Sequence, residues 1–185
     1  MSMLKRFLSG RAGLAAIEFS FIAPVMILTF FGVVEGSQAL SASRRTVLAA
    51  ATLADLVAQE PSITKAQLDD LFVGVEDVID DQSITATFTV ISIYKDTATN
   101  QIKAAWSLDS TGAQPFAAGS VYTGTIDATL LDDASSLIIG EASFNYSSAI
   151  SHKIFPPMTL KKSATRWPRR SQRVQYCNAA NICVS

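Results

Sequence analysis

Apolar residues run almost without interruption from Leu14 to Val34, and this 21-residue stretch is the strongest pattern in the chain. A helix of that length crosses a hydrocarbon layer about 30 Å thick. Beyond it, small and apolar residues recur at helical spacing as far as Ala58, and no further proline occurs before Pro61. We therefore predict one long helix over residues 14–58, about 68 Å in length, whose first half spans a membrane.

A second helix is predicted after this point, opened by residues 61–64. Thr64 and Gln67 have the spacing of a capping box, and apolar residues follow at helical spacing as far as Ile79. The acidic residues of this segment lie mostly outside the apolar stripe. We expect them to form a solvated face, because a calcium site needs ligands that converge from a loop.

From Ile84 onward the apolar period changes from 3.6 residues to two, which is typical of half-buried strands. The predicted elements are, in chain order, a strand at 84–90, a polar turn at 96–101, a strand at 102–108, a loop at 109–125, a brief helix or turn at 126–131, and strands at 137–146, 151–155 and 158–164, followed by irregular chain. These elements predict an α+β fold. The outer half of the long helix would cover one face of a small antiparallel sheet of three or four strands, beside one short additional helix.

Charge is strongly segregated along the chain, although the net charge is only −1. Residues 1–13 carry +3 without any acid, residues 61–155 carry −8, and residues 156–185 carry +6. Because positive flanks stay in the cytoplasm, the leader is expected inside and the rest of the chain outside. The predicted parts are a leader at 1–13, the long helix at 14–58, an exported α+β domain at 59–165 and a basic tail at 166–185.

The only two cysteines, Cys177 and Cys183, lie six positions apart on the predicted exported side. In an oxidising compartment such a pair indicates a small disulfide loop. A metal site would need more ligands, and His152 is the only histidine. We expect His152 to be a surface residue and we expect no metal site.

No pattern in the chain indicates catalysis. There is no glycine-rich phosphate loop and no serine nucleophile elbow, and the acids cluster on one helical face without a basic or metal partner. We therefore expect no enzyme activity, no catalytic residue, no cofactor and no small-molecule substrate.

The basic tail has three interpretations. It could dock on the acidic body of its own or a neighbouring subunit, remain solvated, or bind an external anion such as nucleic acid. We favour docking and do not expect nucleic acid. The residues of this possible docking surface are Lys161, Lys162, Arg166, Arg169, Arg170 and Arg173.

A carboxylate within the apolar stretch requires an explanation, because a charge at the centre of a membrane span costs about 2.5–3.5 kcal/mol. Gly13 is followed by four small or apolar residues and then by Glu18 and Phe19. This arrangement resembles the processing site of type IV prepilins. The wider string, which includes Ile22-Ala23-Pro24-Val25 and Phe31-Gly32-Val33-Val34-Glu35, is similar to the TadE/TadF-like pseudopilins of the tight adherence pilus. The resemblance is specific over roughly residues 10–60.

This resemblance implies that a prepilin peptidase cuts after Gly13, so that Leu14 becomes the N-terminus and Glu18 the fifth residue. Glu18 would then pair with the α-amine of a neighbouring subunit, with Phe19 in the same contact, and Pro24 would bend the helix. From the residues alone, Glu18 could instead lie near the cytoplasmic headgroups, and Pro24 could be a tolerated kink without a role.

The resemblance also implies partners and a location. The partners would be the prepilin peptidase, other pilins and pseudopilins, the pilus assembly machinery and the membrane. The chain would cross the bacterial inner membrane once, with its C-terminal domain in the periplasm, and would be incorporated into an extracellular pilus that supports attachment and biofilm formation. Two alternatives stay open: a single-span anchored binding or adhesion protein without a filament role, and a soluble domain released by signal peptidase.

Overall fold

The computed structural model describes residues 11–79, 86–131, 135–147, 157–178 and 182–184. The chain falls into two compact units, residues 1–40 and residues 41–185. The predicted strand at 151–155, which includes His152, and most of the predicted leader lie outside the described residues.

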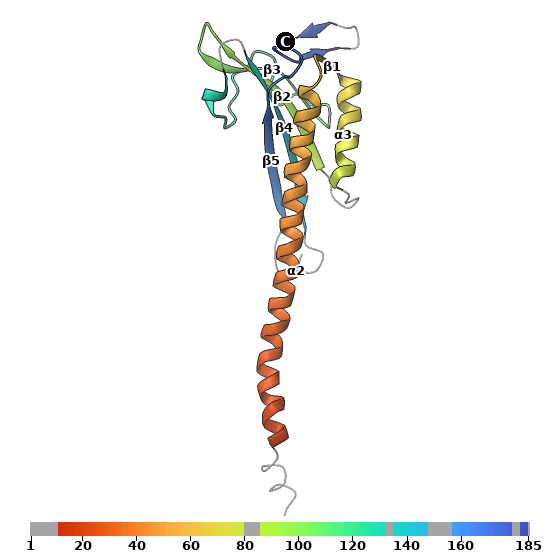
Figure 1. The fold of residues 1–185 in the computed structure, drawn as a ribbon, viewed down its shortest axis with the longest axis vertical. Helices are drawn as coiled ribbons and strands as arrows, with labels where there is room; N and C mark the ends of the chain where they lie inside the picture. The colour runs from red at the N-terminus through yellow and green to blue at the C-terminus, as the bar shows by residue number, and fades with distance from the viewer. Residues whose placement is uncertain (1–10, 80–85, 132–134, 148–156, 179–181, 185) are drawn as a thin grey trace, which may run out of the picture. The chain divides into compact units, whose positions relative to one another are not determined.

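The long N-terminal helix is present as α2, Arg11–Ala58, and Figure 1 shows it as one continuous element. It begins slightly before the predicted start at Leu14, and it continues through Pro24. Its segment from Gly13 onward is the one described helix that is long and apolar enough to cross a membrane. The prediction of a long, membrane-capable helix is confirmed.

The main sheet has four antiparallel strands in the order β3-β2-β4-β5. Their bounds are Ala86–Asp96 for β2, Gln101–Asp109 for β3, Ser136–Tyr146 for β4 and Met158–Arg166 for β5. The predicted β2–β3 hairpin is present, but its strands extend into the predicted turn at 96–101, because Asp96 pairs with Gln101. Asn100 completes its turn with a φ of 55°, a left-handed conformation that asparagine tolerates better than most residues. The α+β prediction is confirmed.

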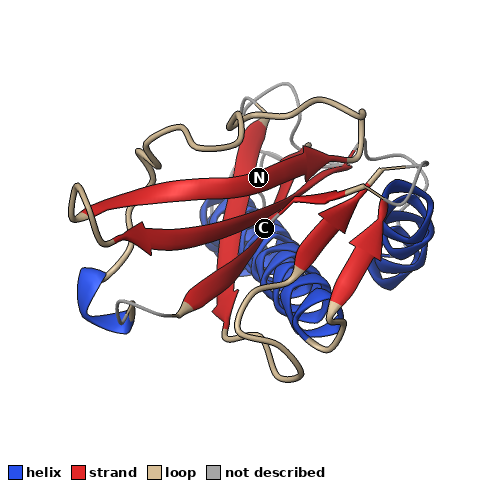
Figure 2. Ribbon diagram, turned by 90° about the horizontal axis from the view of Figure 1, so that it is seen from above, coloured by secondary structure: helices blue, strands red, loops and turns tan. Residues whose placement is uncertain are grey.

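One face of the sheet packs against the outer part of α2, which crosses behind the strands in Figure 2. Leu53 and Val57 of the helix are fully buried there with Phe88, Val90 and Trp106 of the sheet. Small residues of α2 let the helix approach closely. The predicted covering of one sheet face by the outer half of the helix is therefore confirmed.

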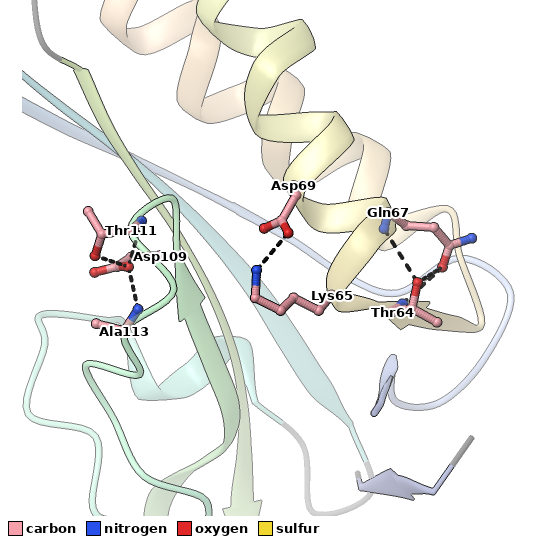
Figure 3. Close-up of polar contacts among 7 residues, drawn as sticks. All are labelled: Thr64, Lys65, Gln67, Asp69, Asp109, Thr111 and Ala113. Atoms are coloured by element: carbon pink, nitrogen blue, oxygen red, sulfur yellow. Dashed lines mark hydrogen bonds and ion pairs between the residues drawn. The ribbon is translucent and has the colours of Figure 1, made fainter. Parts of the chain in front are cut away.

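The opposite face of the sheet is covered by the connection between β3 and β4. Tyr122 and Leu131 from this connection are buried against Ile91, Ile93 and other strand residues. Its first turn is held by the Asp109 carboxylate, which accepts hydrogen bonds from the N–H groups of Thr111 (2.9 Å) and Ala113 (2.8 Å) (Figure 3). The sequence predicts a loop here, with the brief helix η1 at Ala128–Leu130, but not this second core.

The second helix is α3, Lys65–Ile79. The predicted capping box is present, because the Thr64 N–H donates to Gln67 Oε1 at 2.9 Å and the Gln67 N–H donates to Thr64 Oγ1 at 3.4 Å (Figure 3). The expectation that residues 61–64 belong to this helix is wrong. Ser62–Thr64 form the strand β1, which pairs in parallel with a strand from the far end of the chain.

That distant strand is β6, Gln175–Cys177, and it also pairs antiparallel with β7, Cys183–Val184. The expectation of an irregular tail is therefore wrong at these residues. Trp106 Nε1–H donates to the carbonyl of Val174 at 2.8 Å, and Val174 is fully buried. The predicted disulfide joins Cys177 to Cys183, which lie opposite each other in the β6–β7 pair.

An ion pair at the end of the β2–β3 hairpin gives a pH-dependent contribution to stability. Lys103 donates to the Asp96 carboxylate, as do the Thr99 hydroxyl (2.8 Å) and the Ala98 N–H (3.1 Å). Chiefly because of Lys103, these contacts lower the pKa of Asp96 from 3.8 to about 2. Since the folded-state pKa is below the unfolded one, the contribution is complete above pH 4 and is lost as the pH falls towards 2.

We therefore expect Asp96→Asn to destabilise the protein at pH 6 but to have a much smaller effect at pH 2.5. Denaturant unfolding of the wild type and the variant at both pH values measures the difference in their free energies of unfolding. The titration of all other carboxylates cancels in this difference. An equal destabilisation at both pH values would contradict the assignment.

Candidate functional site

The residues singled out for processing and assembly all lie on the first half of α2. Leu14 and Glu18 are four residues apart, so they lie on one face of the helix about one turn from each other. Leu14 is 61% exposed and Phe19 is 68% exposed, while Glu18 and Pro24 are also exposed. The helix thus presents this set of side chains on a surface free for contacts.

The peptide bond between Gly13 and Leu14 lies in the first described turn of α2, which begins at Arg11. A Cβ placed on Gly13 would meet no atom within 4 Å. The predicted cleavage point therefore lies at an exposed position of the helix.

The first half of α2 exposes an apolar surface on all sides. Its two hydroxyl groups are satisfied within the helix, because Ser20 donates to the Ala16 carbonyl and Thr29 to the Val25 carbonyl, each at 2.7 Å. Such internal satisfaction suits a hydrocarbon environment. Apolar surface of this extent is typical of segments in contact with lipid or with other helices. The large exposed side chains include Leu14, Ile17, Phe19, Phe21, Ile22, Val25, Met26, Ile27, Leu28, Phe30, Phe31 and Val33.

The six basic residues of the predicted docking surface do not share one partner. Arg166 and Arg169 both contact Asp55 of α2, the former at 3.7 Å from its Nε. The Lys161 ammonium lies 2.9 Å from the Glu141 carboxylate on the neighbouring strand. These three basic residues thus pair with acids of their own chain.

The other three basic residues have different surroundings. Arg173 lies over the ring of Tyr94, with its guanidinium carbon 4.4 Å from the ring centroid. Arg170 is exposed on the tail and Lys162 is half-buried on β5. The broader hypothesis, in which the tail docks on a neighbouring subunit, stays a prediction.

Asp55 is a residue whose role the sequence analysis missed. It joins the end of α2 to the tail through the two arginines, and the Arg169 N–H also donates to the Ala58 carbonyl at 2.8 Å. The sequence does contain a signal for this role, because Asp55 is the only acidic residue between Glu35 and Glu60. A lone carboxylate on the sheet-covering part of a helix favours a specific cationic partner.

The acidic residues are dispersed rather than gathered into a site. In the part of the chain that the structure describes, no three His, Cys, Asp or Glu residues come close enough together to hold a metal ion. The exposed helix is therefore the candidate functional site, and its chemistry is that of packing and charge pairing.

Comparison with known proteins matches residues 13–55 to the family model of TadE-like proteins. No curated protein and no solved structure matches the chain. The matched segment contains the apolar helix together with Gly13, Glu18 and Pro24. This helix fits a single-pass membrane anchor. Over residues 13–55 the chain is therefore similar to TadE-like proteins, as its sequence pattern indicates.

Proposed function

We propose that the protein is a minor pseudopilin of a tight adherence pilus, a structural subunit and not an enzyme. A prepilin peptidase would remove residues 1–13, and the processed subunit would enter the filament through its N-terminal helix. The observation that carries this proposal is the exposed apolar helix, which bears a carboxylate five residues after an exposed glycine within the TadE-like segment.

Cleavage after Gly13 would change the physical state of the helix. The leader carries three positive charges that hold the N-terminus on the cytoplasmic side. Without it, extraction of α2 from the bilayer no longer requires the transfer of three charges through hydrocarbon. The helix becomes free to move from lipid into a bundle of similar helices, which would shield the same apolar surface.

The new N-terminus at Leu14 would also supply a partner for Glu18. An ammonium group and a carboxylate that are both removed from water are stable only when they neutralise each other. Within one helix the Leu14 amine and the Glu18 carboxylate are about one turn apart along the axis. An adjacent subunit that is shifted by about this distance along the filament axis would place its own amine beside Glu18. The pairing would fix the axial position of each subunit, while the apolar side chains around it supply the contact area.

The proposal also assigns a location to the rest of the chain. The unit formed by residues 41–185 would lie in the periplasm and then on the filament, where an oxidising environment maintains the Cys177–Cys183 disulfide. Its partners would be other pilins and the assembly machinery, and its contribution would be to pilus assembly, surface attachment and biofilm formation.

N-terminal sequencing of the protein tests the proposal. In cells that carry the matching prepilin peptidase, we expect the mature chain to start at Leu14. Gly13→Val should leave the leader in place, because the bulky side chain obstructs the peptidase at the cleaved bond. The matched control is Gly10→Val, which makes the same change three residues earlier and should still yield Leu14.

Two other results would contradict the proposal. An intact leader in the wild-type protein would favour the anchored adhesion protein, whereas a start near Ser43 would favour release by signal peptidase.

A further inference from the structure

A hollow of about 470 Å³ lies where the tail meets the start of β1, and it is lined by Pro61, Ser171, Gln172, Arg173 and Gln175. It is separate from the N-terminal helix that carries the proposed assembly role. Four of its five lining residues are polar, but polar and apolar atoms contribute about equally to its surface, and Pro61 is the one apolar residue. Such a surface favours a ligand with polar groups over a purely apolar one.

The backbone around the hollow is held in place by contacts on several sides. The Gln172 carbonyl accepts a hydrogen bond from the Ser136 hydroxyl at 2.9 Å, and the Gln175 N–H donates to the Pro61 carbonyl at 3.2 Å. Between them, Val174 is fully buried and its carbonyl accepts from the Trp106 indole. The side chains that line the hollow therefore project from a fixed framework, which lowers the entropic cost of binding.

Arg173 gives the hollow a positively charged side chain. Among the described residues that line it there is no carboxylate, and the structure gives the guanidinium a stacking contact with Tyr94. A guanidinium held over an aromatic ring can still present N–H groups at its edge to a ligand. The guanidinium group is planar and carries paired N–H donors, so it can make two parallel hydrogen bonds to one carboxylate.

We propose that this hollow binds a carboxylate-bearing saccharide, such as a uronic acid residue of an acidic polysaccharide. Arg173 would hold the carboxylate. The amides of Gln172 and Gln175, each a donor and an acceptor, would contact ring hydroxyls, and Pro61 would contact the apolar face of the sugar ring. The proposal does not depend on the pilus role.

Other anions fit the hollow less well. A phosphate group carries up to two negative charges and is usually held by several cations or by clustered backbone N–H groups, whereas the lining contains one arginine. An acidic peptide would be expected to add main-chain pairing to an open strand or to anchor an apolar side chain. The lining offers two amides that can donate and accept, and the Ser171 hydroxyl, which donates to the Arg173 carbonyl at 2.8 Å, can still accept from a sugar hydroxyl.

Calorimetry on the full chain in detergent micelles tests this proposal, with trigalacturonate as the probe. We expect trigalacturonate to bind, a neutral trisaccharide of the same linkage to bind much more weakly, and high salt to weaken the binding. Arg173→Gln should weaken binding roughly 10- to 100-fold, the usual effect of losing a charge-assisted hydrogen-bond partner. The matched control is Arg170→Gln, which removes the same charge from an exposed position on the same tail and should change the affinity less than twofold.

A folding control is available because the chain has two tryptophans. In a Trp167→Phe background, fluorescence of Trp106 reports whether Val174 and the tail are still docked. With that signal unchanged, three results would overturn the proposal: no binding of trigalacturonate, equal binding of the neutral trisaccharide, or equal losses in the Arg170 and Arg173 variants. Tighter binding of a triglutamate peptide would overturn the choice of a saccharide.

Discussion

Alanine at position 140 is expected to destabilise the unit formed by residues 41–185 by about 3 kcal/mol, at the upper end of the usual cost of overpacking. Gly140 lies on β4 where α2 crosses the sheet. A Cβ added there would lie 2.5 Å from the Ala50 carbonyl oxygen and 2.9 Å from the Ala54 nitrogen. These are backbone atoms of a buried helix, so they cannot rotate away, and the helix as a whole has to shift.

Thermal unfolding followed by circular dichroism measures this effect. A loss of about 3 kcal/mol corresponds to a fall in Tm of roughly 6–12 °C for a domain of this size. Gly74→Ala is the matched control, because it makes the same change within α3, where an added Cβ would meet no atom within 4 Å. That variant should gain up to about 1 kcal/mol from helix propensity. A Gly140→Ala protein as stable as the wild type would show that α2 does not pack this closely on β4.

Glutamine at position 18 is expected to block incorporation into the pilus while leaving membrane insertion intact. Under the proposed function, the amide removes the charge that neutralises the α-amine of an adjacent subunit. An unpaired buried charge costs about 3–5 kcal/mol, which corresponds to a loss of incorporation of roughly 100-fold or more. Immunoblots that compare sheared pili with the membrane fraction measure the ratio directly.

Glu35→Gln provides the comparison for this variant. Glu35 is the other acid in the first unit and lies at the far end of the apolar stretch, distant in sequence from the new N-terminus. Its replacement should alter incorporation only slightly. Wild-type amounts of the Glu18→Gln protein in sheared pili would show that the carboxylate makes no assembly contact, and would favour the anchored adhesion protein.

Elements with a local signal could be predicted from the sequence. The long helix follows from an apolar run whose pattern lies within α2, and the β2–β3 hairpin follows from alternation on both sides of a polar turn. The cap of α3 follows from two residues three positions apart. In each case the residues that determine the element are neighbours in the chain.

Elements that depend on distant partners could not be predicted. Ser62–Thr64 has no strand pattern of its own and becomes β1 because it pairs with Gln175–Cys177. Val174 is a fully buried core residue, but it lies between Arg173 and Gln175 in a polar stretch of sequence. No apolar pattern therefore predicts its burial. The candidate site likewise has features that a local pattern predicts and features that depend on distant partners. Gly13 and Glu18 are recognisable from their spacing, whereas the pairing of Asp55 with two tail arginines and the polar hollow emerge only when the chain is folded.

The fastening of the tail to the end of α2 has a consequence for biosynthesis. Arg169 contributes a hydrogen bond to Ala58, and β1 finds its partner only at β6. The core therefore cannot close until the ribosome has made residues as far as Cys177, long after the N-terminal helix has been synthesised. During that interval the chain lacks both the buried Val174 and the partner strand of β1, so completion of the core is the last step of folding.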